Sequence, residues 1–399
     1  CRVIGVSFSL KKNEAFYIPI GHRYVGSPKQ LSWDQLKPFL KSVLEKEGIL
    51  KCGQNLKFDD AILNQHGITP KGPSFDTMIA SYCLVPDRSS HGLKALSADY
   101  LSERMTQFKE LVGKQKNASI ADVPIDKAAD YAGADAEVVL RLVDIFTDML
   151  KKEELNNLFE EQEMPLVPVL REMESNGILV DTQYLNEVEH KFRKEMARIE
   201  QEIYSMAGES FMLNSTKQLS RILFEKLNLP VIKRTKTGYS TNEDVLTKLS
   251  KKHPICEKIL AYRELAKLTS TYVDSLLSLV DPISKRVHTT FHQTGTTTGR
   301  LSSSDPNLQN IPIRTELGRE IRKAFVAPAG SVLVSADYSQ IDLRALAHIS
   351  EDPALIKAFQ EGGDIHTATA AEVFHITDAE VTSDMRQKAK AINFGIVYG

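Results

Sequence analysis

Four side chains near the C-terminus recur at every fourth position and combine positive charge with aromatic rings. They are Arg386, Lys390, Phe394 and Tyr398. Because an α-helix advances ~100° per residue, this spacing places them along one slowly turning face of a helix. Two cations one turn apart are costly without an anion, and a triphosphate supplies one. The pattern predicts a nucleotide-binding helix whose rings stack on a base; an amphipathic helix with a solvated basic edge is the alternative.

An acid upstream of this helix could hold a metal ion. Asp337 follows the apolar run 332–334, which predicts a strand over 331–336 with the carboxylate at its end. A carboxylate there can coordinate a hard cation such as Mg²⁺, although it could equally cap the helix that follows. Phosphoryl transfer to a hydroxyl group uses two metal ions about 3.5–4 Å apart. Asp337 would therefore be one of at least two carboxylates.

A second set of residues that could bind metal ions and take part in catalysis lies nearer the N-terminus. Asn55, Phe58 and Asp59 fall in one short segment, and Tyr131 and Asp135 fall in another. The spacing of Tyr131 and Asp135 puts the phenol and the carboxylate on one helix face. Two such carboxylates could hold metal ions for a hydrolysis in which the phenol orients water. Taken singly these are weak signals, because an Asp on a helix is usually solvated.

The elements that position these residues differ between the two parts of the chain. Up to residue 150, short apolar strands alternate with helices, which is an α/β pattern. We expect a hairpin of strands over 3–10 and 15–20, and helices over 36–44 and 125–149.

Beyond residue 151 the pattern changes to long helices. Asp181 can cap a helix whose apolar residues recur at spacings of three and four, as in a helix that packs lengthwise on another. Those residues are Leu185, Val188, Phe192, Met196, Ile199, Ile203 and Met206. Another long helix is expected over 254–279. Such helices suit a lever that grips an elongated molecule, and a plain helical bundle explains the pattern equally well.

Composition sets few limits on function. The 399 residues carry 50 basic and 52 acidic side chains, a balance that neither indicates nor excludes nucleic acid, because affinity depends on a local basic groove. The cysteines Cys1, Cys52, Cys83 and Cys256 are scattered, which argues against disulfides and zinc and for a reducing compartment. No apolar stretch approaches the ~20 residues of a membrane span.

Segments 335–344 and 386–399 resemble motifs A and B of family A DNA polymerases, the bacterial DNA polymerase I type. Segments 298–303 and 305–312 and the exonuclease-like segment 53–59 extend the resemblance in the family's order. The fold class that it implies is a multidomain α+β chain. A ribonuclease H-like α/β exonuclease-type domain would precede a helical thumb and a partial polymerase palm and fingers.

The resemblance also implies domain boundaries. We expect an exonuclease-like domain over 1–150, a thumb over 151–285, part of the palm with motif A over 286–350, and part of the fingers with motif B over 351–399. The chain starts at Cys1 rather than Met and stops inside motif B, so we expect truncation at both ends. With the first exonuclease motif and the third polymerase motif missing, we expect that these residues alone do not polymerise.

For the polymerase chemistry, the resemblance names Asp337, Lys390 and Arg386. Asp337 and the backbone carbonyl of Tyr338 would hold Mg²⁺ in a two-metal site. Lys390 would contact the transferring phosphate and protonate the departing pyrophosphate, while Arg386 would hold the outer phosphates.

Other residues would contact the incoming nucleotide. Phe394 would pack by the sugar and Tyr398 beneath the templating pair. His366 would contact the triphosphate, unless it is an ordinary surface histidine, and Gln340 also falls at a nucleotide-binding position. Asp342 stands where the family usually has Glu, which blocks a ribose 2′-hydroxyl. Because Asp is one methylene shorter, we expect weaker exclusion of ribonucleotides.

The DNA would be held by the segment between the thumb and motif A. Arg300 and Arg314 are candidates for the DNA backbone. The amides of Asn307, Gln309 and Asn310 could bond sugars, phosphates or minor-groove acceptors, which differ little between base pairs. A polar loop whose turns satisfy themselves is the alternative for these amides.

In the exonuclease-like domain, the resemblance makes Asp59 and Asp135 metal ligands, Tyr131 the group that orients water, and Asn55 a further site residue. The expected function is template-directed DNA synthesis in replication or repair, by a monomer that binds primer-template DNA and dNTPs in the cytoplasm at the nucleoid, with no membrane partner. A ribonuclease D-type exonuclease and a non-catalytic DNA-binding module are the alternatives.

Overall fold

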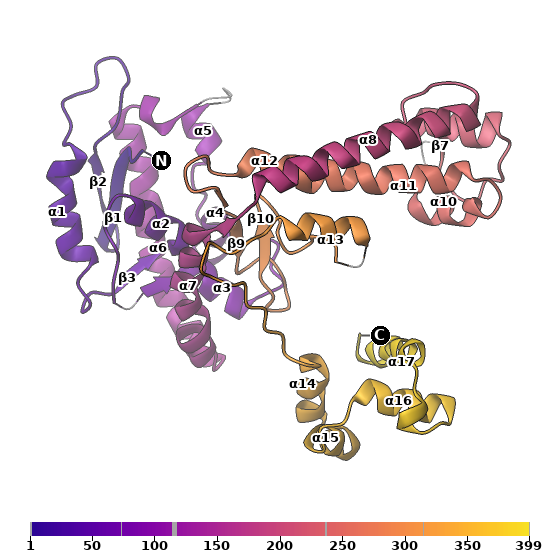
Figure 1. The fold of residues 1–399 in the computed structure, drawn as a ribbon. Helices are drawn as coiled ribbons and strands as arrows, with labels where there is room; N and C mark the ends of the chain where they lie inside the picture. The colour runs from indigo at the N-terminus through magenta and orange to yellow at the C-terminus, as the bar shows by residue number, and fades with distance from the viewer. Residues whose placement is uncertain (1, 73, 114–117, 236–237, 314, 399) are drawn as a thin grey trace. The chain divides into compact units, whose positions relative to one another are not determined.

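The computed structural model describes residues 2–72, 74–113, 118–235, 238–313 and 315–398 (Figure 1). These residues divide into two compact units, 1–330 and 331–399. Within the described part of the chain, no helix is both long and apolar enough to cross a bilayer.

A hairpin packed on a long helix opens the first unit. Strands β1 (Gly5–Lys11) and β2 (Glu14–Pro19) pair antiparallel, and α6 (Ile125–Lys152) packs against both. The apolar residues of α6 recur at helical spacing and are buried: Val138, Val139, Leu142, Phe146 and Leu150. The predicted hairpin and helix are confirmed.

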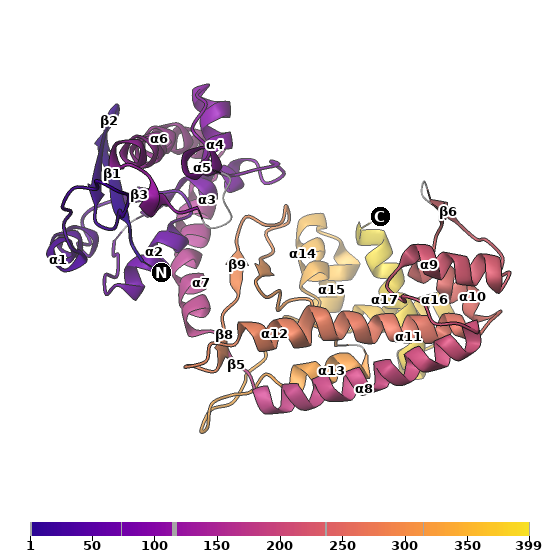
Figure 2. The ribbon, with the colours of Figure 1, turned by 90° about the horizontal axis from the view of Figure 1, so that it is seen from above.

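A short parallel pair of strands places the exonuclease-like segment. Strand β3 (Lys51–Gly53) pairs with β4 (Ser74–Asp76), and each leads into a helix: α2 (Leu56–Gln65) after β3 and α3 (Thr77–Leu84) after β4. Both helices therefore begin at the same edge of the pair. Figure 2 labels α2, α3 and β3 in this part of the chain.

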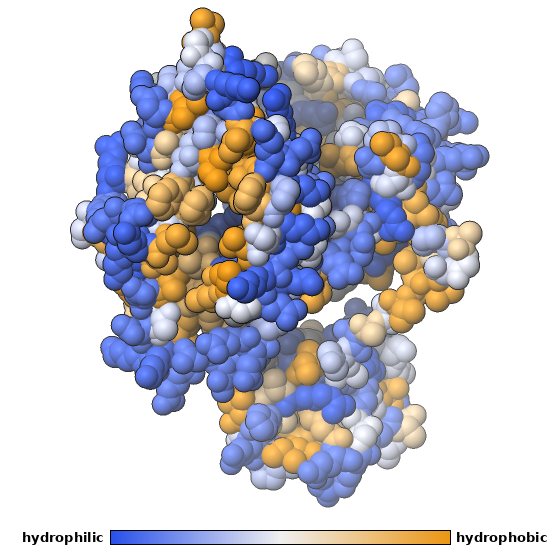
Figure 3. All heavy atoms as spheres, turned by 90° about the vertical axis from the view of Figure 1, so that its left-hand side faces the viewer, coloured by the Kyte–Doolittle hydropathy of each residue, from blue (hydrophilic) through white to orange (hydrophobic). Residues whose placement is uncertain are grey.

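Helix α1 (Trp33–Leu44) begins at a capping box in which Ser32 and Gln35 satisfy each other's backbone N–H groups. It leaves Phe39 and Val43 exposed. Figure 3 shows that apolar side chains, in orange, gather into patches on the face of the molecule that carries this region.

Two long helical segments lie side by side in the second half of this unit (Figures 1 and 2). Asp181 caps α8 (Thr182–Ala207) by accepting a hydrogen bond from the backbone N–H of Tyr184. Opposite it run α11 (Ile255–Leu268), the π-helical turn η5 (Thr269–Val273) and α12 (Asp274–Leu279).

Contacts between these segments show that they are antiparallel. Arg193 reaches Asp274 at 2.9 Å, and further along α8 Glu202 pairs with Lys258 at 2.6 Å. The predicted apolar stripe of α8 faces this partner: Leu185, Val188, Phe192, Ile199 and Ile203 are buried, and Met196 and Met206 pack beside them. The cap, the stripe and the long helix over 254–279 are confirmed.

Unit 1 has two apolar cores and contains further helices and strands. They are α4 (Leu93–Leu96), η1 (Ser97–Leu101), α5 (Phe108–Val112), η2 (Ile120–Asp122), η3 (Leu158–Glu163), α7 (Met164–Asn176), β5 (Ile178–Leu179), α9 (Thr216–Ser220), η4 (Arg221–Lys226), β6 (Arg234–Thr235), β7 (Gly238–Tyr239), α10 (Glu243–Ser250), β8 (Arg286–Val287), β9 (Thr290–His292), β10 (Ser302–Ser304) and α13 (Glu316–Lys323).

The second unit is helical. It contains α14 (Ile341–Ser350), α15 (Pro353–Gln360), α16 (Ile365–Phe374), the short 3₁₀ turn η6 (Asp378–Glu380) and α17 (Ser383–Tyr398). Helix α17 packs mainly on α16, which confirms the helix expected for motif B.

The predicted strand over 331–336 is wrong. This segment has no regular structure, and Val332 and Val334 are 81% and 85% exposed. A strand exists through hydrogen bonds to a neighbour, and within the described residues no strand pairs with this segment. Asp337 therefore follows an exposed segment without regular structure rather than a strand end.

Candidate active sites

Asp364 is the centre of a hydrogen-bond network in the second unit. Its side chain caps α16 by accepting from the backbone N–H of His366 at 3.1 Å, and it also accepts from the Thr367 hydroxyl at 2.8 Å. Gln340 donates its Nε2 to the same carboxylate at 2.8 Å, and Arg386 donates its Nε. The network joins motif A, α16 and α17.

These contacts set the charge state of Asp364. Partial burial raises the pKa of its carboxyl, but hydrogen bonds from Arg386, Thr367 and Gln340 outweigh burial and hold the pKa well below its usual range. The anion that Arg386 requires is thus present in the chain itself. Sequence analysis missed Asp364, although an Asp directly before an apolar helical run is a recognisable cap.

His366 lies beneath the cationic face of α17. It is only 2% exposed, and the Asn393 side chain lies 3.1 Å from its Nδ1. Burial lowers the pKa of His366, the charges of Arg386 and Lys390 lower it further, and Asp364 acts in the opposite direction. The predicted contacts Arg386, Lys390 and His366 are therefore neighbours, and the imidazole is a buried residue rather than a surface one.

The remaining candidates of the second unit are less enclosed. Asp337 and Tyr338 are exposed, and Asp342 is half-buried in the first turn of α14. Phe394 and Tyr398 belong to α17, but their side chains lie outside the described residues.

In the first unit, the loop that carries Arg300 is anchored to the exonuclease-like domain. Arg300 is exposed, and its carbonyl accepts a hydrogen bond from Thr296 at 2.7 Å. The backbone N–H of the preceding Gly299 donates to the hydroxyl of Tyr82, in α3, at 3.1 Å. The guanidinium is thus presented to solvent from a braced loop.

The amide candidates partly satisfy their own turn. Asn307 Oδ1 accepts from the backbone N–H of Gln309 at 3.0 Å. The carbonyl of Asn310 accepts from the Tyr272 hydroxyl at 2.5 Å. All three amide side chains are exposed. Arg314 lies outside the described residues.

At the exonuclease-like segment, Asp76 ties β4 to the start of α2. Its buried carboxylate accepts from the backbone N–H groups of Asn55 at 3.0 Å, Leu56 at 2.7 Å and Met78 at 2.8 Å. Burial raises the pKa of Asp76, and these backbone hydrogen bonds oppose the rise. They also hold Asn55 in a left-handed conformation, with φ at 60°. Sequence analysis missed Asp76 too, although it stands directly before the apolar run of α3 and caps that helix.

Asp59 lies one turn into α2, close to the acidic residues Asp60 and Asp76. Partial withdrawal of its carboxyl from water, together with repulsion from Asp60 and Asp76, raises the pKa of Asp59 to about 7. Asp60 is raised to a pKa of about 6 by burial, although Arg171 lowers it. A nearby cation would stabilise the charged form of such a carboxylate.

Tyr131 and Asp135 meet on α6 as their spacing predicts, and Lys94 of α4 joins them. The Tyr131 hydroxyl and the Lys94 ammonium both hydrogen-bond to Asp135, and Lys94 Nζ lies 4.4 Å from the centre of the Tyr131 ring. Burial raises the pKa of Asp135, and Lys94 opposes the rise. Burial also raises the pKa of Tyr131 to about 12.

The carboxylates of the exonuclease-like segment and the single carboxylate of Asp337 differ in how well they suit a metal ion. Among the described residues, no three His, Cys, Asp or Glu side chains form a ready metal cluster. Asp59 and Asp135 are nevertheless carboxylates, the ligand type that Mg²⁺ prefers, and burial together with repulsion from Asp60 and Asp76 raises the pKa of Asp59. The exonuclease-like residues fit a divalent ion, whereas Asp337 offers one carboxylate.

A buried ion pair connects the exonuclease-like segment to the rest of unit 1. Lys57 of α2 pairs with Glu174 at the end of α7 and donates to the carbonyl of Phe291 at 2.5 Å. The backbone N–H of Phe291 donates to Glu174 at 2.6 Å. Because Phe291 lies in β9, this cluster fixes the hairpin that leads into the Arg300 loop.

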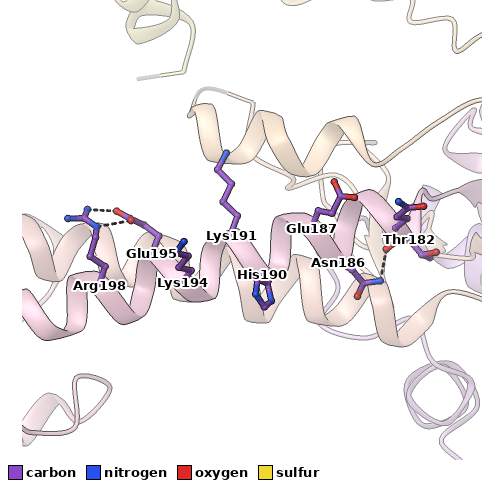
Figure 4. Close-up of a pocket in the computed structure, with 9 residues that line it drawn as sticks. Thr182, Asn186, Glu187, His190, Lys191, Lys194, Glu195 and Arg198 are labelled. Atoms are coloured by element: carbon purple, nitrogen blue, oxygen red, sulfur yellow. Dashed lines mark hydrogen bonds and ion pairs between the residues drawn. The ribbon is translucent and has the colours of Figure 1, made fainter.

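A hollow of about 1210 Å³ lies along the basic face of α8. Figure 4 shows Lys191, Lys194 and Arg198 on this face, with Arg198 paired to Glu195. None of the site residues expected from the sequence lines the hollow.

Comparisons with known proteins cover nearly the whole chain. A family model described as DNA polymerase family A matches residues 182–399, and a model described as 3′-5′ exonuclease matches residues 2–151. DNA polymerase I of Pseudomonas aeruginosa is 44% identical over 405 residues, across the whole of this chain and 44% of that protein. DNA polymerase I of Bacillus subtilis is 47% identical over 338 residues, across 84% of this chain and 38% of that protein.

A solved structure, the POL domain of Pol1 from M. smegmatis in complex with DNA primer-template and dNTP, matches with a TM-score of 0.81 and 35% identity. The match covers 97% of this chain and 63% of that one. The chain thus combines a region of the DNA polymerase family A type with a region of the 3′-5′ exonuclease type. The chain belongs to DNA polymerase family A, and the expected multidomain α+β fold class is confirmed. It spans less than half the length of these curated relatives.

Proposed function

We propose that this chain forms part of an enzyme that carries out template-directed DNA synthesis, with primer-template DNA and dNTPs as substrates. The observation that carries the proposal is the Asp364 network, which gathers Gln340, His366 and Arg386 from three segments. Support comes from the solved relative, the POL domain of Pol1 from M. smegmatis in complex with DNA primer-template and dNTP.

In this proposal Arg386 and Lys390 bind the triphosphate. Arg386 exchanges Asp364 for the outer phosphates, and Lys390 gives a proton to the departing pyrophosphate. Buried His366, whose pKa is lowered by burial, supports this face and reaches the triphosphate if α17 shifts on binding. Gln340 positions the nucleotide from motif A.

Phe394 and Tyr398 would complete the nucleotide site beside the sugar and beneath the templating pair, and Asp342 would face the sugar 2′ position. Asp337 and the Tyr338 carbonyl would hold Mg²⁺, which neutralises charge on the phosphates and activates the attacking hydroxyl. Asp337 supplies one of the carboxylates that two ions need.

We also propose a proofreading hydrolysis in the exonuclease-type domain. Asp59 and Asp135 would hold divalent ions, which supply an activated water and stabilise the leaving oxygen. Tyr131, whose raised pKa of about 12 keeps its hydroxyl protonated, would orient the attacking water by donating or accepting a hydrogen bond. Asn55 would hold the start of α2 in place beside them.

DNA would be held by residues of the segment that precedes motif A. Arg300 and Arg314 suit the DNA backbone, and Asn307, Gln309 and Asn310 suit sugar, phosphate or minor-groove contacts. The basic face of α8 would add sequence-independent contacts. The proposal includes an exonuclease-like domain over 1–150, a thumb over 151–285, part of the palm over 286–350 and part of the fingers over 351–399. It also includes a monomeric state and a location on nucleoid DNA in the cytoplasm.

A ribonuclease D-type exonuclease would account for the first domain alone. The family A match over 182–399 favours the polymerase, and triphosphate binding by α17 would distinguish it from a DNA-binding module that performs no chemistry.

The test is primer extension and 3′-end hydrolysis by the whole gene product that carries these residues, as purified and with Asp337→Asn or Asp135→Asn. We expect Asp337→Asn to abolish extension and spare hydrolysis, and Asp135→Asn to do the reverse. Extension that survives Asp337→Asn would contradict the polymerase assignment, and hydrolysis that survives Asp135→Asn would contradict the exonuclease assignment.

A further inference from the structure

Lys94 places a positive charge where the exonuclease-type site needs one. Its ammonium pairs with Asp135 and lies 4.4 Å from the centre of the Tyr131 ring. Tyr131 in turn hydrogen-bonds to Asp135. The three side chains therefore form a closed triangle of contacts among a cation, an anion and a π-face.

The elements that build this triangle hold it in place. Tyr131 and Asp135 lie one turn apart on α6, the long helix that carries much of the domain core, and α4 packs against α6. The side chains of Lys94 and Asp135 are 22% and 31% exposed, so the pair is partly shielded from water. Shielding makes an ion pair stronger than an exposed one and less sensitive to salt.

We propose that Lys94 is a resident cation that holds Asp135 until a divalent metal ion displaces it, so that metal loading of the exonuclease site is opposed by this lysine. The inference rests on the exonuclease part of the proposed function. Lys94 is a positioning residue here: it keeps the carboxylate and the phenol arranged when no metal is bound, and it withdraws when Asp135 turns to the metal.

The two positive charges compete for one carboxylate. A hydrogen bond between charged groups that metal binding must break reduces the affinity for the metal by the strength of that bond, which for a partly shielded pair is about tenfold in the dissociation constant. Removing the lysine charge should therefore strengthen metal binding, whereas removing a ligand should weaken it.

The test measures the Kd of Mn²⁺ for the 399-residue chain without DNA. Electron paramagnetic resonance reports the concentration of free Mn²⁺ during the titration. All variants carry Asp337→Asn, which removes the acid expected to bind metal in the other unit. We expect Lys94→Met and Lys94→Gln each to lower the Kd about tenfold, and Lys94→Arg, which retains the ion pair, to stay near the unmodified value.

A matched control comes from the same helix. Lys12 pairs with Asp144 of α6 at 2.8 Å, so Lys12→Met removes the same charge from another pair on α6. We expect it to leave the Kd unchanged. If Lys12→Met strengthens Mn²⁺ binding as much as Lys94→Met does, the effect is one of net charge, and the proposal is overturned.

Asp135→Asn separates this inference from the proposed function. Mn²⁺ binding that disappears in Asp135→Asn but is unchanged or weaker in Lys94→Met would reject the role of Lys94 and leave the exonuclease site intact. Mn²⁺ binding that is the same with and without Asp135 would reject the metal site itself, and the inference with it.

Discussion

The guanidinium of Arg386 donates from its Nε to the carboxylate of Asp364, and this contact joins α17 to the N-terminus of α16. An anion within the chain thereby occupies the guanidinium that we propose for the outer phosphates of a dNTP. Binding of the nucleotide would exchange one anion for another, and the arginine would be positioned in advance.

Replacement of Asp364 should destabilise the second unit. Asp364→Ala removes the cap of α16, which costs about 1–2 kcal/mol, together with the anchor for Arg386. Asp364→Asn is the matched control, because it can still cap the helix, and it should retain most of the stability. Hydrogen exchange of the α16 amides measures the difference, and equal protection in Asp364→Ala and the unmodified chain would contradict it.

Asp364 should also make the stability of the second unit depend on pH in the acid range. Hydrogen bonds in the folded state lower the pKa of Asp364 below its ordinary value, so its contribution to stability is complete above the unfolded pKa of about 3.9 and is lost as pH falls below it. Protection of α16 should therefore decline in acid, and Asp364→Asn should flatten the decline. A decline of the same size in Asp364→Asn would assign it to other groups.

Lys57 and Glu174 should be strongly coupled. Their side chains are 12% and 18% exposed, so Lys57→Met leaves a nearly buried carboxylate without its cation, which costs about 3–5 kcal/mol. Denaturant unfolding, monitored in the exonuclease-type domain, measures this loss.

The double variant Lys57→Met/Glu174→Gln is the control for this pair. It removes both charges while the amide can still accept from the backbone N–H of Phe291, so we expect it to recover much of the loss. Additive losses in the two single variants and the double variant would show that the pair is not coupled.

Asp59 should make the folded state less stable as pH rises. Its folded pKa of about 7 lies above the unfolded value, so the folded state holds the proton more tightly, and stability falls as pH rises through this range. Asp59→Asn removes the effect and should be more stable than the unmodified chain at pH 8 by up to about 1 kcal/mol, reduced because the side chain is partly solvated. Melting temperatures at pH 5 and pH 8 test this. An advantage for Asp59→Asn that is no larger at pH 8 than at pH 5 would contradict the raised pKa.

Local signals in the sequence were sufficient for the longest helices. Asp181 predicted the start of α8, and the stripe from Leu185 to Ile203 predicted its buried face, because capping and helical periodicity depend on neighbours within a few residues. The segment 331–336 shows the limit of this approach. Its apolar residues suit a strand, but a strand also needs a partner, and a sequence pattern does not contain the partner.

Site residues related by local spacing could likewise be predicted from the sequence, whereas those related by tertiary contacts could not. Spacing alone brought Tyr131 and Asp135 together, since both lie on one helix. Asp364, Asp76 and Lys94 were missed because each acts through a contact with a distant segment: Asp364 with α17, Asp76 with the start of α2, and Lys94 with α6. Such contacts depend on tertiary packing, which no local pattern in one sequence records.

Asp342 should weaken discrimination against ribonucleotides. Asp342 lies half-buried in the first turn of α14. Because its side chain is one methylene shorter than the Glu usual in the family, it should block a ribose 2′-hydroxyl less completely. In the whole gene product, Asp342→Glu should raise the preference for dNTPs over rNTPs by about tenfold, a difference of ~1.4 kcal/mol. Competition between the two nucleotides in primer extension measures it, and equal ratios in both forms would rule the idea out.

The account depends most on the cationic face of α17, and calorimetric titration of the 399-residue chain with dNTP and Mg²⁺ tests that face directly. Lys388 is the matched control, because it belongs to the same helix and pairs with Asp384 at 2.7 Å. We predict that Arg386→Ala and Lys390→Ala each raise the Kd for dNTP by about tenfold or more, as loss of a charged hydrogen bond implies, while Lys388→Ala leaves the Kd unchanged. The same change in all three variants, or none in Arg386→Ala and Lys390→Ala, would contradict the account.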